Sequence, residues 1–189
     1  MSKIAEFKPV RKDPTKVLVR ARLSFVHLAE PWGNEGQTKK YSVSCIIPKD
    51  DTETIKIIRE AIEEAKKVGK DKCWKGSIPK KLDISFRDGD EEKDDPAYLG
   101  SMYFSASSRQ PVPVVNKLKE DIDPSEAYSG CWGVVGVNFY PYDTNGNRGI
   151  AAGLNIVVKF ADDDRLDASG NGLKMIEDID FGTDSFDDL

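Results

Sequence analysis

The sequence predicts a mainly β protein with one or two helices, and three observations support this fold class. Apolar side chains alternate with other side chains over several long stretches, as expected of strands that bury one face. The dipeptide Asn145-Gly146 joins the last two of these stretches and is a strong hairpin signal. Residues 50–69 instead carry an apolar stripe at helical spacing. The alternating stretches are 16–28, 41–48, 98–108, 131–143 and 148–160.

The first stretch predicts a half-buried strand with a basic outer face. Its outer face would carry Arg20, Arg22 and Ser24, and its core face is the set Val17, Val19, Ala21, Leu23 and Phe25. In the second stretch Cys45 lies on the core side, and Pro48 ends the strand. The helical stripe consists of Ile55, Ile58, Ile62, Ala65 and Val68. Asp50, Asp51 and Thr52 can cap this helix, and Gly69 can end it.

Five strands, one long helix and a closing hairpin are compatible with a small β-barrel of the oligonucleotide/oligosaccharide-binding (OB) type. The helix would be an insertion, since it lies between the second and third strands. A β-sandwich is the competing architecture. We predict an irregular N-terminal arm over residues 1–15, a folded domain over 16–165 and a flexible acidic tail over 166–189.

Charge is unevenly distributed along the chain. Residues 1–49 hold ten Lys or Arg against four Asp or Glu, whereas residues 162–189 hold two against ten. This asymmetry predicts a polyanion site together with an acidic competitor in the same chain. Phenylalanines among the tail acids could also dock on partner proteins. The tail residues in question are Asp180, Phe181, Asp184, Phe186, Asp187 and Asp188.

The sequence gives weak support to an enzyme. His27 is the sole histidine and has no nucleophile motif nearby, and no phosphate-binding or zinc-protease spacing occurs. The acidic residues of 88–95 could hold Mg²⁺, but they lack the EF-hand order. Three widely spaced cysteines support neither zinc nor disulfides. We therefore expect no catalytic residue, no cofactor and no metal site.

Binding of single-stranded nucleic acid fits the residues better. It needs basic side chains along the phosphates and aromatic faces for the bases. In residues 132–142 the alternation places Trp132, Tyr140 and Tyr142 on one face, which is either a stacking strip or a second core. Tyr103 is expected to be exposed, because Ser101 and Ser105 share its face. The candidates are Arg20, Arg22, Trp32, Lys39, Lys40, Arg87, Tyr103, Arg109, Trp132, Tyr140, Tyr142 and Arg148, with Lys117 as a further phosphate contact.

With these residues in view, the chain resembles a family of bacteriophage and prophage single-stranded DNA-binding proteins that was formerly a domain of unknown function. The resemblance implies an OB fold with insertions, sequence-nonspecific binding of single-stranded DNA and a flexible acidic C-terminus. It also marks motif positions at Arg87-Asp88-Gly89-Asp90, 107–116 and 147–154. The matching stretches are YSVSCIIPK and the helix after it, SFRDGDEEKDDPAYLGSMYFSASSRQPVPVV, YSGCW and NRGIAAGLNIVVKF.

We therefore expect a protein that binds single-stranded DNA in phage replication and recombination, with a tail that modulates binding and contacts replication or recombination proteins. Two alternatives stay open: a Mg²⁺-dependent nuclease using residues 88–95, and a virion or assembly barrel that binds no DNA. With no apolar signal or membrane-spanning run, we expect a soluble protein in the cytoplasm of the host cell, as a monomer or dimer.

Overall fold

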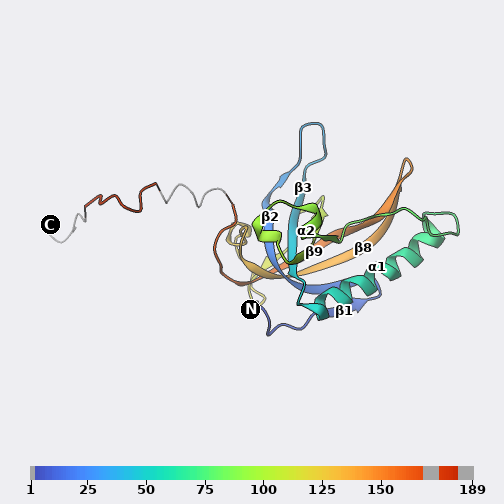
Figure 1. Cartoon of the computed structure of the whole chain (residues 1–189), viewed down its shortest axis with the longest axis horizontal. Coiled ribbons are helices and arrows are strands. Elements are labelled where there is room, and N and C mark those ends of the chain that lie inside the picture. Colours follow the sequence, from blue (N-terminus) through green and yellow to red (C-terminus); the bar gives the residue numbers. More distant parts are fainter. Residues whose placement is uncertain (1–2, 168–174, 183–189) are drawn as a thin grey trace.

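Five long strands close into a barrel in the order β2-β3-β6-β9-β8 and back to β2 (Figure 1). The structure is a computed structural model and describes residues 3–167 and 175–182. The long strands are β2 (Lys16–Trp32), β3 (Lys40–Pro48), β6 (Ser101–Ser108), β8 (Trp132–Thr144) and β9 (Asn147–Ala161). The short strands are β1 (Val10–Asp13), β4 (Asp83–Ile84), β5 (Arg87–Asp88) and β7 (Val114–Val115). The helices are α1 (Thr52–Lys72) and α2 (Gly89–Glu92), with 3₁₀ turns η1 (Pro96–Tyr98) and η2 (Pro124–Glu126).

The barrel has the strand arrangement of an OB fold. Strands β2, β3 and β6 form an antiparallel meander, and β8 and β9 form the closing hairpin. The third strand of the meander then runs parallel to β9, where Ala106 pairs with Ala152 and Ser107 with Gly153. This parallel contact closes the sheet on itself, so the OB prediction is confirmed and the β-sandwich is not formed.

The core lies inside the barrel and beneath α1. Leu23, Cys45, Phe104 and Val135 are fully buried within it. Helix α1 lies along the outside of the barrel beside β8 and buries Ile58, Ile62 and Ala65, as the helical stripe predicts (Figure 1). The predicted end of the helix is wrong, because α1 continues through Gly69 to Lys72.

The N-terminal arm is more ordered than the sequence predicts. Residues Val10–Asp13 form β1, which pairs with the start of β2. Further upstream, Ile4 is fully buried against Trp132 and Val134 on the outer face of β8. The arm is therefore wrongly predicted as irregular; it supplies a second, smaller core because the outer face of β8 is itself apolar.

The tail prediction falls partly outside the described residues. Asp180 and Phe181 are described and exposed, whereas Asp184, Phe186, Asp187 and Asp188 lie outside. Among residues 3–167 and 175–182, no helix is long and apolar enough to cross a membrane.

Candidate nucleic-acid interface

The outer face of β3 and β6 is lined by small hydroxyl side chains. Ser44 lies opposite Ser105, and Ser42 lies opposite Ser107, in the antiparallel register of the two strands. OB folds bind oligonucleotides on the face formed by their second and third strands, which are β3 and β6 here. Short side chains allow a ligand to approach this part of the sheet closely and offer it hydrogen bonds.

Phe25 projects over this face because β2 contains a bulge. The β2–β3 register shifts between Ser24 and His27, and Phe25 adopts a left-handed φ of 45°. The ring is 55% exposed, so the prediction that Phe25 continues the core face is wrong. The apolar phase slips by one residue, from Leu23 to Val26 and Leu28, and this slip is the sequence signal that could have revealed the bulge.

Trp32 ends β2 beside the same face. Its ring is 54% exposed and stacks on His27, with 5.1 Å between ring centroids and 12° between planes. Together with Phe25 these rings border a cavity of about 440 Å³, which we call the β3–β6 groove. Its remaining lining residues are Ser42, Val43, Ser44, Lys93 and Ser105.

Lys93 brings a positive charge to the end of the groove nearest Phe25. Its ammonium lies 5.3 Å from the centre of the Phe25 ring and 5.2 Å from that of Tyr98. It also lies 5.3 Å from the centre of Tyr103, which is buried edge-on against Tyr98. Burial makes the prediction of an exposed Tyr103 wrong. Lys93 is not among the predicted DNA contacts, because it is surrounded by acids in the sequence.

Predicted cations line the other end of the groove. A hollow of about 480 Å³ shares Trp32 and Ser42 with the groove and is also lined by Lys40 and Arg109. Lys39, the neighbour of Lys40 in the chain, is exposed on the hairpin that joins β2 to β3. Within the described part of the chain, these three cations form no ion pair, so their charges are available to a polyanion.

Arg20 is not available in the same way. Its guanidinium binds both carboxylate oxygens of Asp51 at 2.8 Å and donates to the carbonyl oxygens of Ala5 and Phe7. The hydrogen bond to Asp51 outweighs the effect of burial and raises the pKa of Arg20. Asp51 is also the N-cap of α1. The structure therefore places Arg20 as a link between β2, the arm and the helix, away from the groove.

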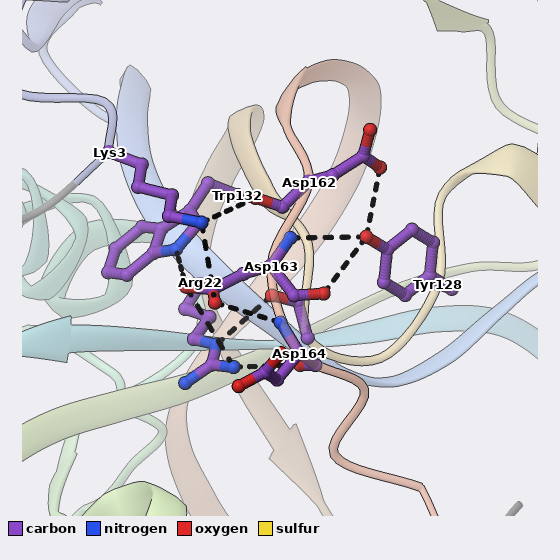
Figure 2. A network of polar contacts seen from close by, with 8 residues as sticks. Lys3, Arg22, Tyr128, Trp132, Asp162, Asp163 and Asp164 are labelled. Carbon is purple, nitrogen blue, oxygen red and sulfur yellow. Dashed lines mark hydrogen bonds and ion pairs between the residues drawn. The ribbon is translucent and has the colours of Figure 1, made fainter. Parts of the chain in front are cut away.

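Arg22 and Trp132 belong to a polar network around the end of β9 (Figure 2). The indole Nε1 of Trp132 donates to Asp163 Oδ2 at 2.8 Å, and Arg22 donates to the carbonyl oxygens of Gly130 and Asp164. The Trp132 side chain is only 8% exposed, because Ile4 packs against it. Of the two alternatives that the sequence leaves open for Trp132, the stacking strip is wrong and the second core is the one observed.

The remaining candidates lie at the β8–β9 hairpin, apart from Arg87 on β5 and Lys117. Tyr140 is 40% exposed, and Tyr142 lies within hydrogen-bond distance of Asp83. Arg148 pairs with Asp143 at 3.0 Å, and Arg87 pairs with Asp83. OB folds also use this hairpin for ligands. Lys117 lies elsewhere, with its ammonium 4.7 Å from the centre of the Phe160 ring.

The acidic segment 88–95 is held by a lysine. Lys49 Nζ lies 2.8 Å from Asp88 Oδ1 and 2.7 Å from Asp90 Oδ2, and its hydrogen bonds lower the pKa of both carboxyls. Over residues 3–167 and 175–182, no group of three or more His, Cys, Asp or Glu side chains is placed to hold a metal ion.

Comparison with solved structures places this fold among phage proteins. The single-stranded DNA-binding protein from bacteriophage Enc34, in complex with ssDNA, matches with a TM-score of 0.72 and 28% identity, over 86% of this chain and 99% of that chain. The T7 single-stranded DNA-binding protein gp2.5 matches with a TM-score of 0.58 over 89% of this chain and 99% of that one. Its 15% identity supports the likeness of fold alone.

Sequence comparison agrees. Protein p50 of Acyrthosiphon pisum secondary endosymbiont phage 1 is 32% identical over 171 residues, which span 86% of this chain and 91% of p50. A family model described as the ssDNA-binding protein of Enterobacter phage Enc34 matches residues 15–188, which is more than half of the chain. The chain therefore belongs to the Enc34 ssDNA-binding protein family.

Proposed function

We propose that this chain binds single-stranded DNA without sequence preference, in the β3–β6 groove, during phage DNA replication and recombination. Membership of the Enc34 ssDNA-binding protein family supports the ligand class. The observation that carries the location is the exposure of Phe25 and Trp32 over a serine floor on the face that OB folds use.

Each part of the groove suits one part of a single strand. Exposed aromatic rings stack on unpaired bases with about 1–3 kcal/mol per base, and they accept any base because every base has a π-face. Lys40, Lys93 and Arg109 would neutralise phosphates and release counterions, so affinity falls as salt rises. Duplex DNA would bind more weakly, since its bases are already stacked on one another.

We expect the bound strand to remain intact, because stacking and charge neutralisation break no covalent bond. Incubation of labelled ssDNA with the protein and Mg²⁺ tests this expectation. Intact DNA after prolonged incubation supports a binding protein, whereas cleavage that the variant Asp88→Asn abolishes would overturn it. A phage protein of this kind would act in the cytoplasm of the infected cell.

Fluorescence anisotropy of a labelled dT oligonucleotide tests the groove. The double variant Phe25→Ala/Trp32→Ala should lose about 2 kcal/mol or more of binding free energy, roughly thirty-fold in Kd. Leu118→Ala is the matched control, because it removes an apolar side chain that is 77% exposed and lies outside the groove. Equal affinity of the double variant and the control would place the DNA elsewhere.

The proposal extends to the chain's organisation: residues 16–165 form the DNA-binding domain, and residues 166–189 form a tail that modulates it. Leu166 packs against Ile46, Tyr98 and Tyr103, so the tail begins beside the rings that surround Lys93. A tethered acidic segment has an effective concentration on the order of millimolar near the groove. It would compete weakly with DNA, and Phe181 could contact replication or recombination proteins.

Neutralising the tail in the full chain tests this regulation. Changing Glu177 to Gln and the five aspartates after it to Asn removes the negative charges and keeps the shape of the side chains. We expect tighter DNA binding at low salt and a smaller difference at high salt, where screening weakens the competition. The same affinity at low salt for both proteins would contradict competition and leave the groove proposal intact.

A further inference from the structure

A second basic surface lies outside the groove, at the end of α1. Residues 66–81 contain seven lysines and one aspartate, a surplus of six positive charges in a chain whose net charge is −5. Lys66 and Lys67 pair with glutamates of the same helix. The other five are exposed and make no ion pair with any residue in the described ranges. We call these five the lysine platform: Lys70, Lys72, Lys75, Lys80 and Lys81.

The platform is anchored to the barrel by Trp74. Its side chain is 3% exposed, and its indole Nε1 donates to the carbonyl oxygen of Tyr142 on β8 at 3.2 Å. Gly69 makes room for the ring, because a Cβ there would lie 2.6 Å from a Trp74 ring carbon. The backbone N–H groups of Cys73 and Trp74 both donate to the Gly69 carbonyl. The lysines are therefore presented by a pinned turn rather than a free loop.

The platform adjoins the hairpin that borders the ligand face of an OB fold. Lys81 lines a hollow of about 550 Å³ with Tyr142 and Arg148 of the β8–β9 hairpin. From there the chain pairs with β9 through β4 and then with β6 through β5. A continuous stretch of backbone thus connects the platform to the strand that forms one side of the groove.

We propose that the lysine platform is a second phosphate-binding surface, which contacts single-stranded DNA after it leaves the groove past the β8–β9 hairpin. This inference rests on the proposed function and deepens it by extending the site. Lysine ammonium groups are point charges that neutralise phosphates without fixing their position. The tryptophan of the platform is buried beneath them, so this surface offers charge rather than stacking.

Salt titrations with two lengths of dT oligonucleotide test the platform. A length of about 6 nucleotides lies at the low end of the range that one OB fold covers, and a length of about 30 nucleotides lies well above it. The platform variant is Lys72→Gln/Lys80→Gln/Lys81→Gln in the full chain. The control variant, Lys8→Gln/Lys12→Gln/Lys56→Gln, removes the same charge from exposed lysines elsewhere.

We expect the platform variant to bind the long oligonucleotide more weakly than the control does, and the short one equally well. Each phosphate that is no longer neutralised should lower the slope of log K against log salt by about 0.7, so the triple variant should lower it by about 2 for the long strand. Platform and control variants with the same slope for the long strand would overturn the proposal.

A second result would also overturn it. An equal loss for both lengths would mean that the lysines act on something every oligonucleotide meets, such as by holding the acidic tail away from the groove. Failure of the groove itself is distinguishable, because the Phe25→Ala/Trp32→Ala variant would then bind both lengths as the unaltered chain does.

Discussion

The ammonium of Lys93 lies 5.3 Å from the centre of the Phe25 ring. This contact joins the segment after α2 to the bulge in β2. The ring reaches this position because Phe25 adopts a φ of 45°, a conformation that costs a non-glycine residue about 1–2 kcal/mol. Strain of this kind clusters at functional sites. Here it turns a large apolar side chain outward, beside a cation, over the serine floor of the groove.

Replacing Phe25 by glycine should separate stability from binding. Glycine adopts the left-handed conformation without a steric cost, and the lost ring is already exposed. We expect the free energy of unfolding to stay the same or to rise by up to about 1 kcal/mol, while ssDNA binding weakens by about 1–3 kcal/mol. Urea denaturation and anisotropy measure the two quantities. Loss of stability together with unchanged binding would show that Phe25 serves the fold.

His27 should make DNA binding depend on pH. Burial lowers the pKa of His27 below its usual value of 6.5, so its imidazole is neutral near pH 7. As the pH falls through the lowered pKa, the ring gains a positive charge beside Trp32 in the groove, and DNA phosphates favour that form. Affinity should therefore rise between about pH 7 and pH 5 more steeply than in His27→Gln. Parallel pH profiles of the two proteins would place the bound phosphates away from His27.

Arg20→Gln should affect the fold rather than the DNA. It leaves Asp51, whose side chain is 9% exposed, without its ion pair and should cost about 3–5 kcal/mol of unfolding free energy. Arg59→Gln, which removes an exposed charge from α1, is the control. Affinity for ssDNA, measured where both variants are folded, should be equal. A loss of affinity specific to Arg20→Gln would restore Arg20 as a DNA contact.

The part of the effect of Arg20 on stability that comes from its ion pair with Asp51 should be lost in acid. Burial raises the pKa of Asp51, but hydrogen bonds from Arg20 and Thr54 outweigh it and hold the pKa below the usual 3.8. A carboxyl with a lowered folded-state pKa stabilises the protein above its unfolded-state pKa and loses this contribution as the pH falls through the folded value. The stability gap between the unaltered chain and Arg20→Gln should thus be constant above about pH 5 and narrow below about pH 4, to the part that comes from the hydrogen bonds of Arg20 to Ala5 and Phe7.

Gly69→Ala should destabilise the protein although alanine is the better helix former. The new methyl group would lie 2.6 Å from the Trp74 ring and 2.7 Å from Pro141 Cβ, and overpacking of this kind costs about 1–3 kcal/mol. This cost exceeds the gain of about 1 kcal/mol in helix propensity. Lys67→Ala on the exposed side of the same helix should be neutral. A rise in melting temperature for Gly69→Ala would show that Trp74 packs differently.

Alternation along the chain predicted the barrel because each long strand buries one face, and Asn145-Gly146 predicted the hairpin that brings β9 back to β6. The helix was predicted for the same reason, from one apolar stripe. The exposure of Phe25 is not predicted, because a bulge shifts the apolar alternation of β2 by one residue. An alternation that is continued through the bulge assigns every later side chain to the wrong face.

The candidate site was harder to predict than the fold. Trp132 and Tyr140 lie on the same face of β8, yet one is buried and the other exposed, because Ile4 covers the former. Similarly, Arg20 is held by the distant acid Asp51 and by carbonyl oxygens of the arm, whereas Lys40 lines the hollow at the end of the groove. Alternation assigns a residue to a face, but the segment that covers that face comes from elsewhere in the chain. Of the predicted candidates, Trp32, Lys40 and Arg109 line one hollow at the end of the groove, and their contact with DNA stays a prediction.

The most direct test of the account is to locate the bound strand on the protein. A dT oligonucleotide containing 5-bromouracil is crosslinked to the full chain by ultraviolet light, and the modified peptides are identified by mass spectrometry. We expect crosslinks at Phe25 and Trp32, on the face built by β3 and β6. Crosslinks confined to Trp132 or to the face of α1, with Phe25 and Trp32 unmodified, would contradict it.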